Sequence, residues 1–302
     1  MKNIKIIIFI YVLFCGFYQL KLIAQDQVEL TGSFFNQKNP GFIPEIFLPG
    51  IISTEDHEHG ITINPCGNEI YFTRRISREE GNRIYFTKKV DGVWIKPILA
   101  PFAKLCRESS PNISPDGKRL FFNSRRSLPE EIKSPYEMNV WFVSREGEKW
   151  VNPEVIKNPV MEYYPMFVTQ TNKGVIYFTG NVNRGIYKAD LENGRYVNVE
   201  KLPEEINSHN WAGHPYVDPE EKYIIFDSNI DEAGTKNLFI SFKEKNYWTE
   251  SVNINQCEGF PKHAAIAHVS FDKRYLFFSS GGDIYWVNSA IIDKLKFEIS
   301  TK

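Results

Sequence analysis

A motif of two short β-rich runs joined by a polar turn occurs five times along this 302-residue chain. Its second copy runs from Ser114-Pro115-Asp116-Gly117 to Leu120-Phe121-Phe122. The last phenylalanine marks the repeat, and its five copies are Phe72, Phe122, Phe178, Phe226 and Phe278. Successive copies are 50, 56, 48 and 52 residues apart. A period of about 50 residues is typical of the four-stranded blade of a β-propeller and is too long for most helical repeats.

Each copy of the motif predicts the beginning of one blade. Turn residues such as Pro115-Asp116-Gly117 join the two innermost strands into a hairpin. A third run ending in aromatic residues follows, and a fourth run centres on Trp94, Trp150, Tyr196 or Trp248. The sequence therefore predicts an all-β, five-bladed β-propeller of four-stranded blades. Its innermost strands are expected near residues 61–64, 111–114, 165–169, 214–218 and 265–270.

The fifth repeat lacks a fourth run, because only sixteen residues follow Trp286 and those from Ala290 to Leu295 resemble a short amphipathic helix. Residues Phe42 to Phe47, before the first repeat, read Phe-Ile-Pro-Glu-Ile-Phe and have the composition of an outer strand. An open ring of blades would leave unpaired strand edges. We therefore expect this N-terminal strand to complete the fifth blade and to close the ring as a velcro strand.

The segment from Ser114 to Phe122 resembles the repeat of the WD40-like propellers of PD40 or TolB type, which occur in many bacterial exported proteins. The resemblance covers roughly the whole mature chain. Two copies depart from the pattern: the third carries two extra residues between Gln170 and Gly174, and the fifth has Phe271-Asp272-Lys273 in place of Pro-Asp-Gly. The resemblance implies the fold and says little about activity, because propellers include enzymes, adaptors and binding proteins.

The N-terminus has the features of a signal peptide. Lys2 and Lys5 precede an apolar run from Ile6 to Phe17, which is shorter than the ~20 residues needed to span a bilayer. We expect cleavage near Ala24, giving a signal peptide (1–24) and a single β-propeller domain (25–302). The mature protein is then expected to be periplasmic or extracellular, without a transmembrane span. Lipoprotein anchoring through Cys15 is not expected, because the residue before it is the bulky Phe14 rather than a small one.

Charge and cysteine content narrow the partners and cofactors. The chain has 36 basic and 37 acidic residues and a formal charge of −1, so nucleic acid is not an expected partner. The mature chain keeps Cys66, Cys106 and Cys257, an odd number in a compartment that permits disulfides, and their pairing stays open. No Cys-x-x-Cys pair is present, so a structural zinc site is not predicted.

Ligands of propellers usually bind where the loops before the innermost strands meet the loops between the second and third strands, at the mouth of the central channel. Counted back from the repeat phenylalanines, Glu58, Glu108 and Glu162 share one position, where blades four and five have Ala212 and Ala264. Arginines follow the second strands of blades one and two, and they are Arg74, Arg75, Arg125 and Arg126. Two interpretations stay open: ion pairs that fix the loops, or a clamp for a substrate carboxylate or phosphate.

All six histidines fall near the first, fourth and fifth innermost strands, and they are His57, His59, His209, His214, His263 and His268. These three blades adjoin in a closed ring. Since His57 and His263 hold the same repeat position on neighbouring blades, they can ligate a divalent metal such as zinc or manganese together with Glu58. The alternative is that the imidazoles hydrogen-bond to backbone carbonyl groups without any ligand.

Aromatic side chains complete the predicted mouth, because Tyr163, Tyr164 and Trp211 lie in the same loops and can stack on a sugar ring or a peptide, unless they pack internally. No Gly-x-Ser-x-Gly or His-Glu-x-x-His motif is present. We therefore predict an exported, non-catalytic module that binds a peptide, a protein or a glycan at the channel mouth without a cofactor. The alternative is a carbohydrate-active hydrolase or lyase that uses the histidine and glutamate cluster, with or without a divalent metal.

Overall fold

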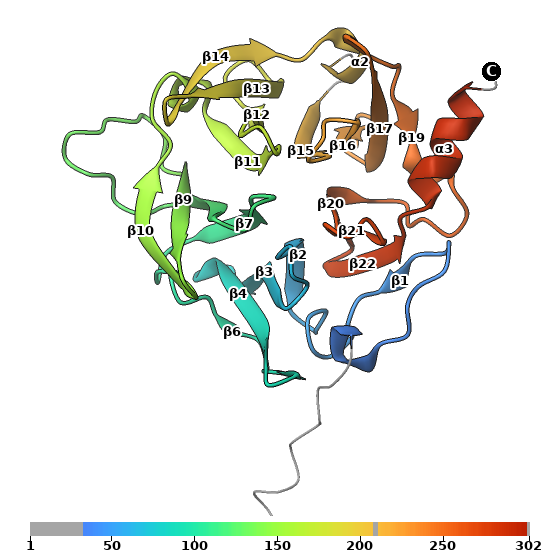
Figure 1. The fold of residues 1–302 in the computed structure, drawn as a ribbon, viewed down its shortest axis with the longest axis horizontal. Helices are drawn as coiled ribbons and strands as arrows, with labels where there is room; N and C mark the ends of the chain where they lie inside the picture. Colours follow the sequence, from blue (N-terminus) through green and yellow to red (C-terminus); the bar gives the residue numbers. More distant parts are fainter. Residues whose placement is uncertain (1–32, 208–210, 301–302) are drawn as a thin grey trace, which may run out of the picture.

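Five antiparallel sheets stand around a common axis in the computed structural model of the protein, which describes residues 33–207 and 211–300 (Figure 1). Each sheet is one blade, and its innermost strand faces the axis. The predicted five-bladed β-propeller is confirmed. None of the helices within the described residues is long and apolar enough to cross a membrane.

The strands follow one another outward in each of the first four blades. Blade one contains β2 (His57–Ile63), β3 (Glu69–Ser77), β4 (Gly81–Val90) and an outer strand in two pieces, β5 (Val93–Trp94) and β6 (Ile98–Leu99). Blade two contains β7 (Glu108–Ile113), β8 (Arg119–Ser124), β9 (Asn139–Glu146) and β10 (Lys149–Val155).

Blade three contains β11 (Pro165–Gln170), β12 (Ile176–Gly180), β13 (Gly185–Glu192) and β14 (Arg195–Lys201). Blade four contains β15 (Ala212–Val217), β16 (Tyr223–Asn229), β17 (Lys236–Glu244) and the outer pieces β18 (Tyr247–Trp248) and β19 (Val252–Asn253). Blade five contains β20 (Ala265–Val269), β21 (Tyr275–Ser280) and β22 (Asp283–Asn288). The first two innermost strands begin three to four residues earlier than the sequence predicts.

The outer position of the fifth sheet is occupied by β1 (Glu45–Ile46), from the N-terminal part of the chain. Glu45 pairs with Trp286 and Ile46 with Tyr285, in antiparallel register. The next backbone N–H, that of Phe47, donates to Ile284 O at 2.7 Å. The strand is shorter than the predicted run of residues 42–47, and whether the ring depends on it is a prediction taken up in the Discussion.

Each innermost strand carries a bulge whose residue has a positive φ between 49° and 59°, and these residues are Gly60, Ser110, Phe167, His214 and Ile266. Their backbone N–H groups donate to side chains of the preceding blade at 2.8–3.4 Å. The acceptors each follow a repeat phenylalanine, and they are Thr73, Asn123, Thr179, Asp227 and Ser279. The result is a ring of five interblade hydrogen bonds, one at every junction.

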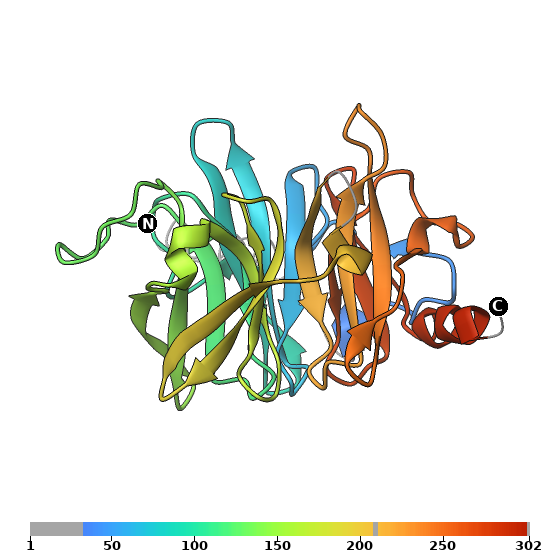
Figure 2. The same ribbon diagram turned by 90° about the horizontal axis from the view of Figure 1, so that it is seen from above.

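The core lies between neighbouring sheets, where the alternate side chains of each strand interdigitate with those of the next blade. All five repeat phenylalanines are at most 1% exposed. The predicted C-terminal helix is α3 (Ile291–Ser300), and it packs Ile291, Ile292 and Leu295 against the core of blades four and five. In the side view (Figure 2), the cyan β3–β4 hairpin and the orange β16–β17 loop rise from the same face of the ring, which is the face of the predicted channel mouth.

Candidate functional site

A cavity of about 350 Å³ opens at the predicted channel mouth, over blades five, one and four. Blade one contributes His57 and His59 of β2 and Arg75 of β3. Blade four contributes Lys236 from the start of β17, and the loop before β20 contributes His263. Below it, the five bulges narrow the channel to a space of about 20 Å³, roughly one water molecule. A ligand larger than water therefore cannot enter the channel at the level of the bulges.

Glu58 lies within this wall but faces inward, and its side chain is fully buried. Its carboxylate accepts a 2.7 Å hydrogen bond from Arg74 Nε and two from Thr54, at 3.1 Å from the backbone N–H and at 2.7 Å from Oγ1. Arg74 donates in turn to the carbonyl groups of Ile51 and Ile52. The Glu58–Arg74 ion pair thus holds the loop before β2 in place, which agrees with the interpretation that these residues fix the loops.

Glu108 repeats this arrangement in blade two. It is also fully buried and accepts from Arg126 Nε at 2.6 Å, Ser124 Oγ at 2.8 Å and the backbone N–H of Lys104 at 2.9 Å. The arginine that pairs with Glu108 is therefore Arg126. The other predicted residue, Arg125, pairs with Glu137 at 3.2 Å on the exposed side.

The predicted equivalence of Glu162 with Glu58 and Glu108 is wrong. Glu162 lies exposed in a short 3-10 helix (Val160–Tyr163), and Pro165 takes the aligned position because it pairs with Gly180, two residues after the repeat phenylalanine. The β11–β12 turn is one residue shorter than the β7–β8 turn, whereas the sequence alignment assumed two extra residues there. The strand pairings of blades four and five place Ala212 and Ala264 at the position of Glu58 and Glu108, as predicted.

Three of the described histidines, His57, His59 and His263, line the mouth cavity. His57 and His263 are exposed, and the His57 and His59 rings lie 5.9 Å apart. Burial lowers the pKa of His59 to about 3, and the neighbouring His57 and Arg75 act in the same direction. Within the described residues, no group of three or more His, Cys, Asp or Glu side chains is placed to hold a metal ion.

His214 lines the narrow part of the channel and forms a close polar contact with Asp227. Its Nδ1 lies 2.6 Å from Oδ1 of Asp227, which is fully buried and also 3.1 Å from Lys236 Nζ through its other oxygen. Burial alone would raise the pKa of the Asp227 carboxyl, but His214, Lys236 and the Ile266 N–H outweigh it and the net shift is downward. Burial lowers the pKa of the His214 imidazole, and Asp227 opposes this shift only in part. With its pKa below the ordinary value, the His214 imidazole is neutral at neutral pH and lies against the Asp227 carboxylate.

The aromatic residues of the predicted mouth pack against protein groups. Trp211 lies over Gly213, with its ring 5.0 Å from the His214 ring and 3.9 Å from Lys236 Nζ. Tyr164 stacks on Tyr136 with ring centroids 4.1 Å apart. Trp211 thus packs beside the His214 ring and Lys236. Tyr164 belongs to a separate aromatic pair with Tyr136 of blade two.

Sequence analysis missed Asp227 and Lys236. A signal for Asp227 was present, since every repeat phenylalanine is followed by a small polar residue and only the fourth copy has a carboxylate there. Lys236 had no such signal, because its role depends on the fold bringing β17 beside Asp227. The sequence also left the disulfide pairing of the cysteines undecided. In this structure Cys66, Cys106 and Cys257 are all free thiols. His209 lies outside the described residues.

The chain was compared with known protein families, curated proteins and solved structures. No known protein family and no curated protein matches the sequence. Among solved structures, a TolB-type protein of Agrobacterium tumefaciens is 14% identical over 75% of this chain and 71% of its own, with a TM-score of 0.47. The gluconolactonase XC5397 of Xanthomonas campestris is 13% identical over 76% and 71% of the two chains, with the same TM-score. A further gluconolactonase-type structure is 11% identical over 87% and 94%, again at 0.47. These likenesses concern the propeller architecture and assign no activity.

Proposed function

We propose that this protein is an exported binding module that takes a carboxylate-bearing glycan at the channel mouth. The observation that carries the proposal is the charge of the mouth cavity. Arg75, Lys236 and three histidines line it, while its only lining carboxylate among the described residues, Glu58, is buried and paired with Arg74. A cavity that presents cationic donors and no exposed acid favours an anionic ligand.

The size and the remaining lining favour a sugar. A volume of about 350 Å³ lies at the lower end of the range for small-ligand sites, roughly 300–1,000 Å³. Asn82, Ser279 and Ser280 supply neutral hydrogen-bonding side chains, and the backbone of Gly281 and Gly282 borders the same space. Uronic acids combine a carboxylate with several hydroxyl groups. One such ligand can therefore bind both the cationic side chains and the neutral hydrogen-bonding groups of the cavity.

The experiment is calorimetric titration of the purified protein with short uronic-acid oligosaccharides. Arg75→Gln removes an exposed cation of the cavity and is expected to weaken binding by about tenfold, the value of one charge-assisted hydrogen bond. Lys236→Gln is expected to weaken it similarly, and a melting curve checks that Asp227 tolerates the loss. Lys149→Gln, an exposed lysine of the outer strand β10, is the control with the same charge change. Equal affinities of the wild-type and Arg75→Gln proteins would count against the proposal.

A second candidate function rests on the His214–Asp227 pair. A neutral imidazole whose Nδ1 is held by a buried carboxylate is the arrangement of a general base, which a carbohydrate-active hydrolase or lyase requires. Incubation of the same oligosaccharides with the protein tests it, by counting new reducing ends and unsaturated products. His214→Ala abolishes turnover if the pair is catalytic. If the wild-type protein leaves the oligosaccharides unchanged, the hydrolase or lyase function is excluded and the binding function remains.

The divalent metal predicted from His57 and His263 stays a separate hypothesis. The described residues offer these two imidazoles no third ligand, so a metal here would need water or the ligand itself to complete its coordination. Elemental analysis of the purified protein and of His57→Ala measures it directly. Stoichiometric zinc or manganese that is lost in the variant would establish the site.

A further inference from the structure

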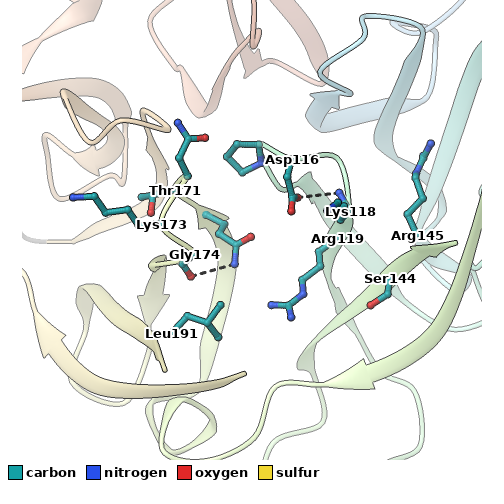
Figure 3. A pocket seen from close by; sticks show the side chains of 12 residues that line it. Asp116, Lys118, Arg119, Ser144, Arg145, Thr171, Lys173, Gly174 and Leu191 are labelled. Atoms are coloured by element: carbon teal, nitrogen blue, oxygen red, sulfur yellow. Dashed lines mark hydrogen bonds between the residues drawn. The ribbon is translucent and has the colours of Figure 1, made fainter. Parts of the chain in front are cut away.

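A second, larger groove of about 550 Å³ lies between blades two and three, at the opposite ends of the strands from the channel mouth. The β7–β8 turn and the start of β8 form one wall, and the β11–β12 turn with Leu191 of β13 forms the other. Figure 3 shows the Arg119 side chain reaching into the space toward Leu191. Asp116 also lines the groove, and its Oδ1 accepts hydrogen bonds from Ser114 Oγ at 2.6 Å and from the backbone N–H of Lys118 at 3.0 Å.

The preceding junction, between blades one and two, has an ion pair at this place. There Glu69, three residues before its repeat phenylalanine, forms a two-pronged ion pair with Arg145 on the third strand of blade two. Arg145 pairs across the sheet with Trp150 of the outer strand and stacks on its ring, with the guanidinium 4.2 Å from the ring centroid. The junction is closed by one carboxylate and one guanidinium group.

At the junction of blades two and three the same positions hold Arg119 and Leu191. Arg119 also stands three residues before its repeat phenylalanine, and Leu191 pairs with Tyr196 of the outer strand as Arg145 pairs with Trp150. The cation is therefore present on the opposite side of the junction, and the carboxylate is missing. The groove occupies the volume that the Glu69–Arg145 pair fills one junction earlier.

Arg119 has little internal compensation for its charge. Within the described residues its guanidinium group forms one long hydrogen bond, of 3.4 Å to the Tyr196 hydroxyl, which also accepts from Gln170 Nε2 at 3.0 Å, and it lies 5.3 Å from the centroid of the Phe142 ring. None of the ion pairs among the described residues involves Arg119, Lys118 or Lys173. One buried polar atom of the wall, Thr171 Oγ1, also lacks a hydrogen-bond partner there. A half-buried guanidinium with free donors is suited to bind an oxyanion.

We propose that this groove is a binding site for a small oxyanion ligand, a carboxylate or a phosphate, which pairs with Arg119 as Glu69 pairs with Arg145. The ligand anion supplies the charge that the protein itself provides at the preceding junction. Leu191 and Pro115 border its apolar part, and Lys118 and Lys173 lie at the rim. The site is distinct from the channel mouth, and its existence does not depend on the function proposed there.

Two probes separate the carboxylate from the phosphate: glucuronate and inorganic phosphate, each titrated into the full protein and followed by two-dimensional NMR. Saturable shifts confined to residues of the β7–β8 and β11–β12 turns are expected for at least one probe. Arg119→Gln is expected to weaken that binding by about tenfold or more, and Arg119→Lys to restore part of it. Arg274→Gln is the matched control, because Arg274 lies in the corresponding turn of blade five and pairs with Asp272 at 2.6 Å.

A gain-of-contact variant makes the test independent of any damage caused by losing Arg119. Leu191→Glu places a carboxylate where blade two has Arg145, so it is expected to pair with Arg119, raise the melting temperature relative to Leu191→Gln and abolish binding of both probes. Lys236→Gln, at the channel mouth, is expected to leave binding in the groove unchanged. The proposal is overturned if neither probe gives saturable shifts in these turns, or if Arg119→Gln binds as tightly as the wild type.

Discussion

The backbone N–H of Gly60 donates a 3.1 Å hydrogen bond to Ser279 Oγ and so joins the first blade directly to the last. The same contact occurs at the other four junctions, always from the bulge residue of one innermost strand to the residue after the preceding repeat phenylalanine. At the junction of blades one and two both groups are buried, so the bond from the Ser110 N–H to Thr73 Oγ1 satisfies a donor that has no access to water. The ring is thus held together on the channel side by hydrogen bonds and on the outside by packing.

Removing one acceptor from this ring should destabilise the protein. Thr73→Val keeps the shape of the side chain but leaves the Ser110 N–H, now bonded at 2.8 Å, without an acceptor. We expect a loss of ~1–3 kcal/mol in the free energy of unfolding, measured by chemical denaturation. Thr169→Val is the control, since Thr169 Oγ1 is buried and has no hydrogen-bond partner in the described part of the chain. A cost for Thr73→Val no greater than that of the control would contradict this account of the ring.

The N-terminal strand gives a second prediction. Phe47 is fully buried and packs its ring 5.0 Å from those of Phe277 and Trp286 of blade five. Phe47→Ala is expected to cost ~3–5 kcal/mol, whereas Phe42→Ala, at a side chain 49% exposed, stays within ~0.5 kcal/mol. Deleting residues up to Leu48 should lower the melting temperature by several degrees or cause aggregation. A truncated protein that stays monomeric with an unchanged melting curve would show that the ring does not depend on this strand.

The turn between β7 and β8 needs a glycine. Gly117 has a φ of +70°, in the region that side chains with a branched Cβ rarely adopt. Gly117→Val is expected to cost ~1–3 kcal/mol through backbone strain. Gly41 has no positive φ, and a Cβ there would meet no atom within 4 Å, so Gly41→Val should change stability little. Comparable costs at both positions would remove strain as the explanation.

Acid should destabilise the fold through His268. Its ring is 2% exposed between Tyr216 and Phe271, and burial lowers its pKa to about 3. The unfolded chain binds a proton near pH 6.5 and the folded one does not, so this contribution to stability is present above pH 6.5 and is lost as the pH falls toward 3. By pH 5 the loss is about 2 kcal/mol. His268→Phe should reduce the difference in unfolding free energy between pH 8 and pH 5 by that amount, and an unaltered pH dependence would contradict it.

The blades were predictable because their signals are local. The polar turn, the repeat phenylalanine and the aromatic third strand lie within one stretch of chain, and each copy repeats them with a nearly constant spacing. The outer strand of blade five was predictable for a different reason. An unpaired run such as Phe42 to Phe47 has only one vacant edge to pair with.

The details of the mouth were less predictable, because they depend on register and on contacts between blades. Arg126 rather than Arg125 pairs with Glu108, and this depends on the path of the loop after β8, where the Arg126 N–H donates to Ser124 Oγ. Glu162 fell out of register through the length of a single turn. Lys236 contacts Asp227 because the start of β17 lies beside β16 in the folded sheet. No local sequence pattern predicts this contact.

Binding of a carboxylate-bearing glycan at the channel mouth is tested by comparing two ligands that differ in charge. The wild-type protein is titrated with a short uronic-acid oligosaccharide and with its methyl ester, which keeps every hydroxyl group and removes only the charge. Because Arg75 and Lys236 bring positive charge to the lining of the cavity, we expect the acid to bind at least about tenfold more tightly than the ester. Equal affinity for the two ligands, or no binding of the acid, would contradict the claim.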